Sequence, residues 1–103
     1  MDLEELKLAI SLENYRISAH AINEAIEDNL EVKTVVKSLN VSESEIIEDY
    51  PDGKPLPCCL VLSNTDTFPI HTVWAYDKIT KKCILVTVYK PDPAKWVEFK
   101  KRR

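Results

Sequence analysis

The 103-residue chain has a single glycine, only two histidines and no long apolar run. With one glycine it has no Gly-rich loop of the kind that cradles phosphates in nucleotide-binding folds. No segment approaches the roughly 18 apolar residues that a membrane-spanning helix needs. The acidic N-terminus has no basic region ahead of an apolar core, unlike a signal peptide. We therefore expect a cytoplasmic protein without a membrane partner.

Cysteine is also scarce, and the three thiols form no recognisable pattern. Cys58, Cys59 and Cys83 lie in apolar runs, their number is odd, and adjacent cysteines rarely bridge each other. We expect buried thiols in a reducing compartment. The histidines lack the HExxH and CxxC contexts of zinc sites, so we predict no metal and no cofactor.

The charge is unevenly distributed along the chain. Residues 1–53 hold 13 Asp/Glu against 4 Lys/Arg (−9), whereas residues 54–103 hold 4 against 10 (+6), which gives the net charge of −3. This asymmetry predicts one cationic surface that attracts RNA or an acidic protein, although solvated tail charge is the simpler alternative. The candidate nucleic-acid-binding residues are Lys90, Lys100, Lys101, Arg102 and Arg103.

Hydrophobic spacing predicts helices in the first part of the chain. Residues 2–12 read as one helix, and Val32, Val35, Val36 and Leu39 indicate another. Between them, residues 14–18 are extended, and a helix capped by Ser18 follows. Its buried stripe is expected to comprise Ile22, Ala25, Ile26 and Leu30.

The second part of the chain predicts strands at residues 45–50, 58–62, 70–76 and 83–89. Gly53 is expected to supply a positive φ in the turn after the first of them. Pro91 and Pro93 end the last strand, residues 93–101 add a helical turn or two, and Trp96 folds back against the core. Helices followed by strands predict a single α+β domain over residues 1–103, with N-terminal helices packed on a small, mainly antiparallel sheet of about four strands.

Four side chains are candidates for chemistry. His20 lies in the first turn of a predicted helix, where the dipole favours neutral imidazole. His71 begins a strand, and Tyr89 and Lys90 end the next, so an antiparallel hairpin brings these three together. A base, an acid and a cation are the ingredients of metal-free RNA cleavage. A structural role for each histidine is the alternative, and the register decides whether His71 and Tyr89 share a face.

Four stretches together resemble the domain-of-unknown-function family 4258. They are YRISAHA (15–21), IIEDYPDGKPLPCCLVL (46–62), PIHTVWAYD (69–77) and VTVYKPDPAKW (86–96). The family is similar to the RelE/ParE-like toxin superfold, in which N-terminal helices pack on a small antiparallel sheet. Its members often resemble the toxin of a toxin–antitoxin pair.

The resemblance implies a toxin-like protein, acting as a metal-independent mRNA endoribonuclease and paired with an antitoxin. By this resemblance, His20, His71 and Tyr89 match the family's site positions. Where the family commonly has Arg-Met, this chain has Glu24 and Ala25, which replaces a cation with a carboxylate near the expected phosphate site. That change favours the alternative, a non-catalytic RelE-like module that binds an antitoxin or another protein.

Overall fold

A computed structural model of the protein describes residues 1–103 and contains three helices, a five-stranded sheet and a separate two-stranded hairpin. The α+β class is confirmed, whereas the expected number of about four strands is too low. None of the helices combines the length and apolar character that crossing a membrane requires. The elements are α1 (Leu3–Ser11), β1 (Tyr15–Ile17), α2 (Ala19–Glu27), α3 (Val32–Val41), β2 (Glu45–Tyr50), β3 (Cys58–Asn64), β4 (Pro69–Asp77), β5 (Lys82–Tyr89), β6 (Trp96–Val97) and β7 (Lys101–Arg102).

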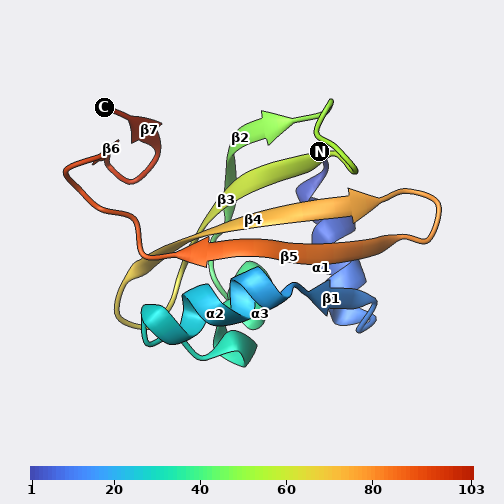
Figure 1. The fold of residues 1–103 in the computed structure, drawn as a ribbon, viewed down its shortest axis with the longest axis horizontal. Helices are drawn as coiled ribbons and strands as arrows, with labels where there is room; N and C mark the ends of the chain where they lie inside the picture. The colour runs from blue at the N-terminus through green and yellow to red at the C-terminus, as the bar shows by residue number, and fades with distance from the viewer.

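The sheet is mixed, with the strand order β1-β5-β4-β3-β2 (Figure 1). Neighbouring strands from β2 to β5 form antiparallel pairs, as the prediction of a mainly antiparallel sheet requires. The extended piece at residues 14–18 becomes β1, which pairs in parallel with β5 and sets Tyr15 opposite Cys83. This fifth strand was not expected to join the sheet, because the partners are far apart in the sequence.

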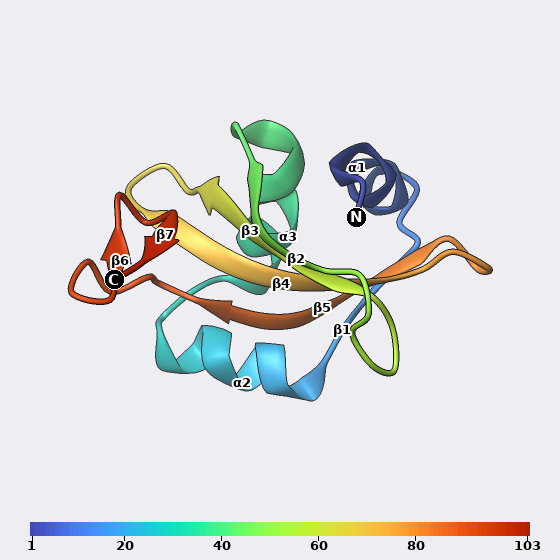
Figure 2. The same cartoon turned by 90° about the horizontal axis from the view of Figure 1, so that it is seen from above.

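All three helices contribute to one hydrophobic core against the sheet. Leu6 from α1, Ala25 from α2 and Leu39 from α3 are fully buried, together with alternate residues of the strands. Figure 1 shows α2 and α3 below the strands, while the β6–β7 hairpin lies at the upper left. Seen from above in Figure 2, α2 runs alongside β5, and α1 and α3 are grouped together.

The expected buried stripe of α2 is partly wrong. Ala25 is buried as predicted, but Ile22 is 41% exposed and Ile26 is 70% exposed. Ala21 takes their place in the core. Two alanines on the inner side let the helix backbone approach β5 closely, which turns the larger isoleucines outward.

The role expected for Gly53 is also wrong, since its φ is not positive. The absence of a side chain is nevertheless required there. A Cβ atom at this position would lie 2.9 Å from the carbonyl oxygen of Leu56 and 3.2 Å from that of Tyr50. The glycine therefore permits a close backbone approach in the turn between β2 and β3.

The C-terminal segment forms a hairpin instead of the expected helical turn. The last sheet strand ends at Tyr89, as the prolines predict, and β6 then pairs with β7. Between these strands Glu98 and Phe99 adopt left-handed conformations, with φ of 52° and 61°. Residues other than glycine rarely adopt such angles, so no local pattern predicts this turn. Trp96 does fold back and is 4% exposed.

Cys59 and Cys83 are buried, as expected, whereas Cys58, which was also expected to be buried, is only half-buried. Burial raises the pKa of Cys59 to about 12 and that of Cys83 to about 11. Both groups therefore remain thiols at neutral pH and pack as small apolar side chains.

Candidate functional site

A β-bulge brings the histidine and tyrosine of the hairpin to the same face of the sheet. Val73 pairs with Thr87 and Trp74 with Leu85, so Val86 is an extra residue in β5. Up to Leu85, odd-numbered residues of β5 face the helices; beyond the bulge, Val88 takes that orientation. Tyr89 consequently points to the opposite face, where it lies directly across from His71.

Ser18, the N-cap of α2, is hydrogen-bonded to this bulge. Its hydroxyl accepts a hydrogen bond from the amide of Ala21 at 3.0 Å and donates one to the carbonyl of Val86 at 3.0 Å. Its own amide donates to the carbonyl of Leu85. The sequence predicted the cap, but it gave no signal that the same hydroxyl also binds the irregular part of β5.

Both ring nitrogens of His71 have partners. Nε2 lies 2.6 Å from the carbonyl oxygen of Phe99, and Nδ1 lies 3.1 Å from the hydroxyl of Tyr89. A carbonyl oxygen only accepts, so Nε2 carries the proton. Nδ1 of the neutral ring therefore accepts the hydrogen bond that the phenol of Tyr89 donates.

His71 is completely buried, with an exposed fraction of 0%. The ring of Trp96 packs edge-on against it, with 4.5 Å between the ring centroids. Burial lowers the pKa of the imidazole below its usual 6.5, and this effect outweighs the opposing hydrogen bond to Phe99. The neutral form is thus favoured at pH 7.

Tyr89 connects this buried ring to the surface. Its side chain is half-buried and lines a hollow of about 610 Å³ between the end of β5 and the C-terminal hairpin. Burial raises the pKa of the phenol, so the hydroxyl stays protonated at neutral pH. His71 does not line the hollow, and Tyr89 is therefore the candidate catalytic group that faces it.

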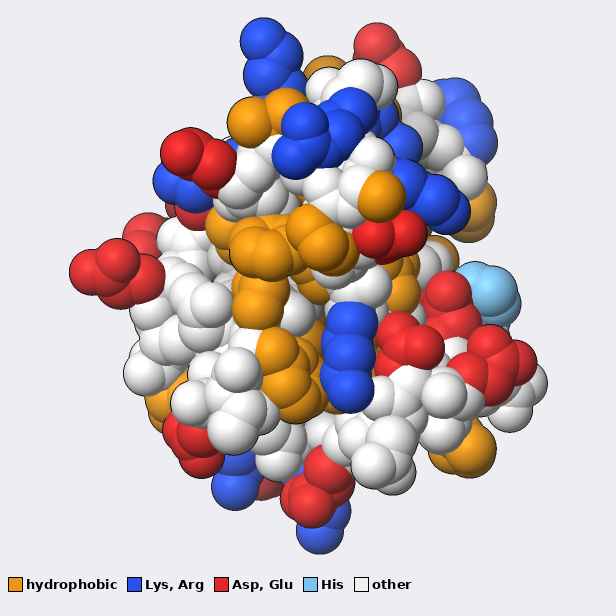
Figure 3. Space-filling model, turned by 90° about the vertical axis from the view of Figure 1, so that its left-hand side faces the viewer, with side chains coloured by type: hydrophobic (Ala, Val, Ile, Leu, Met, Phe, Trp, Pro, Cys, Tyr) orange, Lys and Arg blue, Asp and Glu red, His pale blue; other side chains and the backbone are white.

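The hollow is strongly cationic. Four Lys or Arg side chains line it against a single carboxylate, that of Asp92. Figure 3 shows the corresponding concentration of Lys and Arg at the top of this face of the molecule, above an apolar band. An anion that enters the hollow meets net positive charge next to a phenol. The lining residues are Tyr89, Lys90, Asp92, Ala94, Lys95, Trp96, Arg102 and Arg103.

Three of the predicted nucleic-acid-binding residues line the hollow, and each of them also has a partner within the protein. The ammonium group of Lys90 lies 4.4 Å from the ring centroid of Phe68. Arg102 forms two hydrogen bonds to Glu48 on β2, at 2.7 and 3.0 Å. Nε of Arg103 donates to the backbone carbonyl of Pro93 at 2.9 Å, and Arg103 has no carboxylate partner.

The other two predicted residues lie outside the hollow. Lys100 pairs with Glu45 on β2 at 3.1 Å, and Lys101 is exposed on β7. Lys95, which sequence reasoning did not select, lines the hollow instead. A single lysine after two prolines gave no signal that distinguished it from other surface lysines.

His20 is not brought to the hollow. Its Nε2 lies 3.1 Å from a carboxylate oxygen of Glu24, and the imidazole is 66% exposed. The same oxygen of Glu24 accepts the amide hydrogen of Val88 at 3.2 Å. The carboxylate that departs from the family pattern therefore binds the backbone of β5 one residue before Tyr89.

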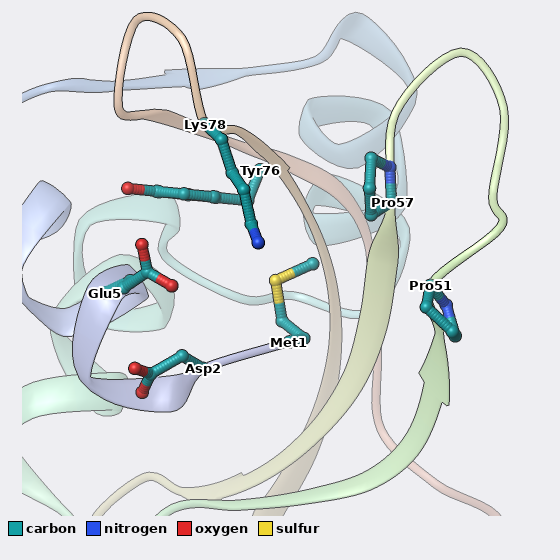
Figure 4. Close-up of a pocket in the computed structure, with 7 residues that line it drawn as sticks. All are labelled: Met1, Asp2, Glu5, Pro51, Pro57, Tyr76 and Lys78. Carbon is teal, nitrogen blue, oxygen red and sulfur yellow. The ribbon is translucent and has the colours of Figure 1, made fainter.

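A second hollow, of about 350 Å³, lies at the other end of β4 and contains none of the predicted site residues. In Figure 4 the side chains of Lys78 and Met1 point into it, and the hydroxyl of Tyr76 lies on the same side as Glu5. No group of three or more potential metal ligands occurs anywhere in the structure. The lining residues of this hollow are Met1, Asp2, Glu5, Pro51, Pro57, Tyr76 and Lys78.

Comparison with known proteins identifies the family. Residues 17–90 match the model of a family described as a domain of unknown function, DUF4258. The match covers most of the chain, including β2–β5 and the His71–Tyr89 pair, and the chain belongs to this family. No curated protein and no solved structure is significantly similar to it.

Proposed function

We propose that this protein is a toxin-like member of a toxin–antitoxin pair that cleaves mRNA without a metal ion. Two findings support the proposal: membership of the DUF4258 family, and a cationic hollow that contains a hydrogen-bonded phenol. The further proposal that the fold is RelE-like is supported by the arrangement of N-terminal helices on a small, mainly antiparallel sheet.

The observation on which the proposal depends is the position of Tyr89 between His71 and the hollow. A ribose 2′-hydroxyl in the hollow gives its proton to the phenol oxygen, while the phenol passes its own proton to Nδ1 of His71. The 2′-oxygen then bonds to phosphorus, and the 5′-oxygen leaves and takes a proton from solvent. This relay leaves a 2′,3′-cyclic phosphate, a neutral tyrosine and an imidazolium.

The cations of the hollow act on the phosphate. Lys95 and Arg103 line the hollow without carboxylate partners, so their charge is available to the phosphorane that forms during the attack. The imidazolium retains two hydrogen-bond acceptors, the carbonyl of Phe99 and the oxygen of Tyr89. Glu48 adds a favourable electrostatic effect on the charged ring.

A specific observation favours the second candidate function, a non-catalytic module that binds an antitoxin or another acidic protein. No ring nitrogen of His71 faces the hollow, and burial disfavours the imidazolium that the relay requires. The cationic hollow then serves binding alone. In both proposals the ligand is anionic and occupies the same surface.

Incubating the purified chain with single-stranded RNA in the presence of EDTA tests the first proposal. We expect products that end in 2′,3′-cyclic phosphate, and a rate at least about 100-fold lower for Tyr89→Phe, the scale of general acid–base catalysis. Tyr15→Phe, the same change on β1 outside the hollow, is the matched control and retains the rate. Anisotropy of a labelled RNA shows whether binding survives in each variant.

Expression in cells gives a second measurement. We expect growth arrest when the chain is produced without a partner, and relief by His71→Ala in protein that remains folded. Intact RNA at high protein concentration, with normal growth and a stable copurifying protein, would reject the endoribonuclease and favour the binding module.

A further inference from the structure

The C-terminal hairpin covers His71 from the outer face of the sheet. Trp96 packs on the imidazole, and the carbonyl of Phe99 accepts its Nε2 hydrogen. Without these two contacts the ring would have only Tyr89 as a polar partner. The burial of His71 therefore depends on a segment that is not part of the five-stranded sheet.

Few interactions hold this hairpin in place. Its strands pair only with each other, and no backbone hydrogen bond joins them to the five-stranded sheet. Attachment depends on two ion pairs to β2, Arg102–Glu48 and Lys100–Glu45, and on the contacts with His71. The cationic side chains of both pairs are more than half exposed, so salt screens them.

The pair between Glu48 and Arg102 is the more specific of the two. The guanidinium binds both carboxylate oxygens and also lies 4.7 Å from the ring centroid of Trp96. The hydroxyl of Tyr50 donates to the same carboxylate. Glu48 thus holds, through Arg102, the indole that covers His71.

The conformation of the hairpin also favours release. Glu98 and Phe99 have positive φ, which L-residues with large side chains adopt only when surrounding contacts compensate. The connection to β5 runs through Pro91 and Pro93, which form no ladder hydrogen bonds. The hairpin can therefore detach without breaking any strand pairing of the main sheet.

We propose that residues 96–103 form a releasable cover that buries His71 and, when closed, completes the cationic hollow beside Tyr89. This inference rests on the proposed function, since it describes the regulation of the same site. In the closed state the ring of His71 is inaccessible. When the cover opens, Nε2 of His71 faces solvent, while Nδ1 keeps its hydrogen bond to Tyr89.

The two histidines allow a direct test, because one is exposed and the other is covered. Diethyl pyrocarbonate modifies accessible neutral imidazoles, and peptide mass spectrometry measures the rate at each histidine. His20 serves as the internal reference in every sample. We expect His71 to react much more slowly than His20 in the unaltered chain, and Glu48→Gln to raise the His71 rate by about fivefold, the upper range for losing an exposed ion pair.

Two further variants sharpen the comparison. Glu4→Gln alters an exposed carboxylate of α1 that pairs only with Lys7, and it should leave both rates unchanged. Trp96→Ala removes the indole directly and should raise the His71 rate at least as much as Glu48→Gln. Circular dichroism confirms that each variant is folded. High salt tests the same ion pairs without a mutation. In the unaltered chain, about 1 M KCl should screen them and raise the His71 rate.

The proposal is overturned if His71 of the unaltered chain reacts as fast as His20, or if neither a folded variant nor high salt changes its rate. RNA cleavage, measured on the same samples, separates this inference from the proposed function. Accessible His71 with intact RNA supports the cover and rejects the endoribonuclease. Cleavage that falls as His71 becomes accessible supports both proposals, because opening removes Trp96, Arg102 and Arg103 from the hollow. Cleavage that stays constant while accessibility rises supports the endoribonuclease and rejects the cover as part of its site.

Discussion

The hydroxyl of Tyr89 lies 3.1 Å from Nδ1 of His71, and the two residues are directly opposite each other in the β4–β5 pair. The hydrogen bond joins a buried neutral imidazole to a phenol at the edge of a cationic hollow. This hydrogen bond stabilises the outer face of the sheet, and it is also the centre of the proposed proton relay. Its contribution to stability, the interactions that support it and the binding of RNA beside it can each be tested by mutation.

The first prediction concerns the stability of the protein as a function of pH. The pKa of His71 is lowered on folding, so the unfolded chain binds a proton more readily than the folded one. Its contribution to stability is therefore complete above the unfolded pKa of about 6.5 and is lost as pH falls toward the folded value. We expect the free energy of unfolding in urea to decrease between about pH 7.5 and 5.

A variant at His71 identifies the source of this pH dependence. His71→Gln should flatten the profile over that range, whereas Lys33→Gln, a change on exposed α3, should retain it. Staying above about pH 5 leaves the carboxyl of Glu48, whose pKa Arg102 lowers, in its ionised form. A profile for His71→Gln as steep as that of the unaltered chain would contradict this assignment.

The second prediction concerns Glu24, whose carboxylate binds both His20 and the backbone of β5. Glu24→Ala removes the acceptor for the amide of Val88, a fully buried residue, and should lower the free energy of unfolding by about 1–3 kcal/mol. Glu24→Gln keeps an acceptor oxygen and should lower the free energy of unfolding by less than Glu24→Ala does. Glu27→Ala, one turn further on the exposed side of α2, is the control, and equal effects at the two positions would argue against this role.

The third prediction concerns Ser18 at the start of α2. Ser18→Ala removes both the helix cap and the hydrogen bond to the bulge, so urea unfolding should show a loss of about 1–2 kcal/mol. Ser11→Ala is the comparison, because that hydroxyl bonds to its own helix at an exposed position. If the two alanine variants are equally stable, the bulge does not depend on this hydroxyl.

The fourth prediction concerns the binding of single-stranded RNA at the hollow. Lys95→Gln and Arg103→Gln should each weaken binding and reduce the slope of log K against log salt by about 0.7, the value per phosphate contact. Lys33→Gln, a charge change on exposed α3, should alter neither quantity. Anisotropy titrations at several salt concentrations measure the affinity and the slope. Equal slopes for all three variants would mean that the RNA binds outside the hollow.

The sequence was most informative where local pattern and packing agree. The apolar spacing of Val35, Val36 and Leu39 correctly predicted a buried helix face, and the prolines after Tyr89 correctly ended the strand. The predicted hairpin between β4 and β5 correctly brought His71 near Tyr89, whereas the register, which the sequence left open, is set by the bulge at Val86. These features depend on neighbours in the sequence.

The features that the sequence did not reveal depend on distant partners. The pairing of Arg102 with Glu48 joins residues that no local pattern relates, and left-handed angles at Glu98 and Phe99 contradict their usual preferences. The outward isoleucines of α2 are a similar case. Helical spacing predicts a stripe, but the closeness of β5 decides that alanines occupy the contact.

The parallel pairing of β1 with β5 has a consequence for how the chain acquires its structure. Tyr15 meets Cys83 only after the residues between them have been synthesised, so β1 remains without its sheet partner while these segments emerge from the ribosome. Pairings of such large sequence separation are reached slowly, because a long loop must close first. Closure of the sheet edge at β1 should therefore be a late step of folding, after the β4–β5 hairpin has formed.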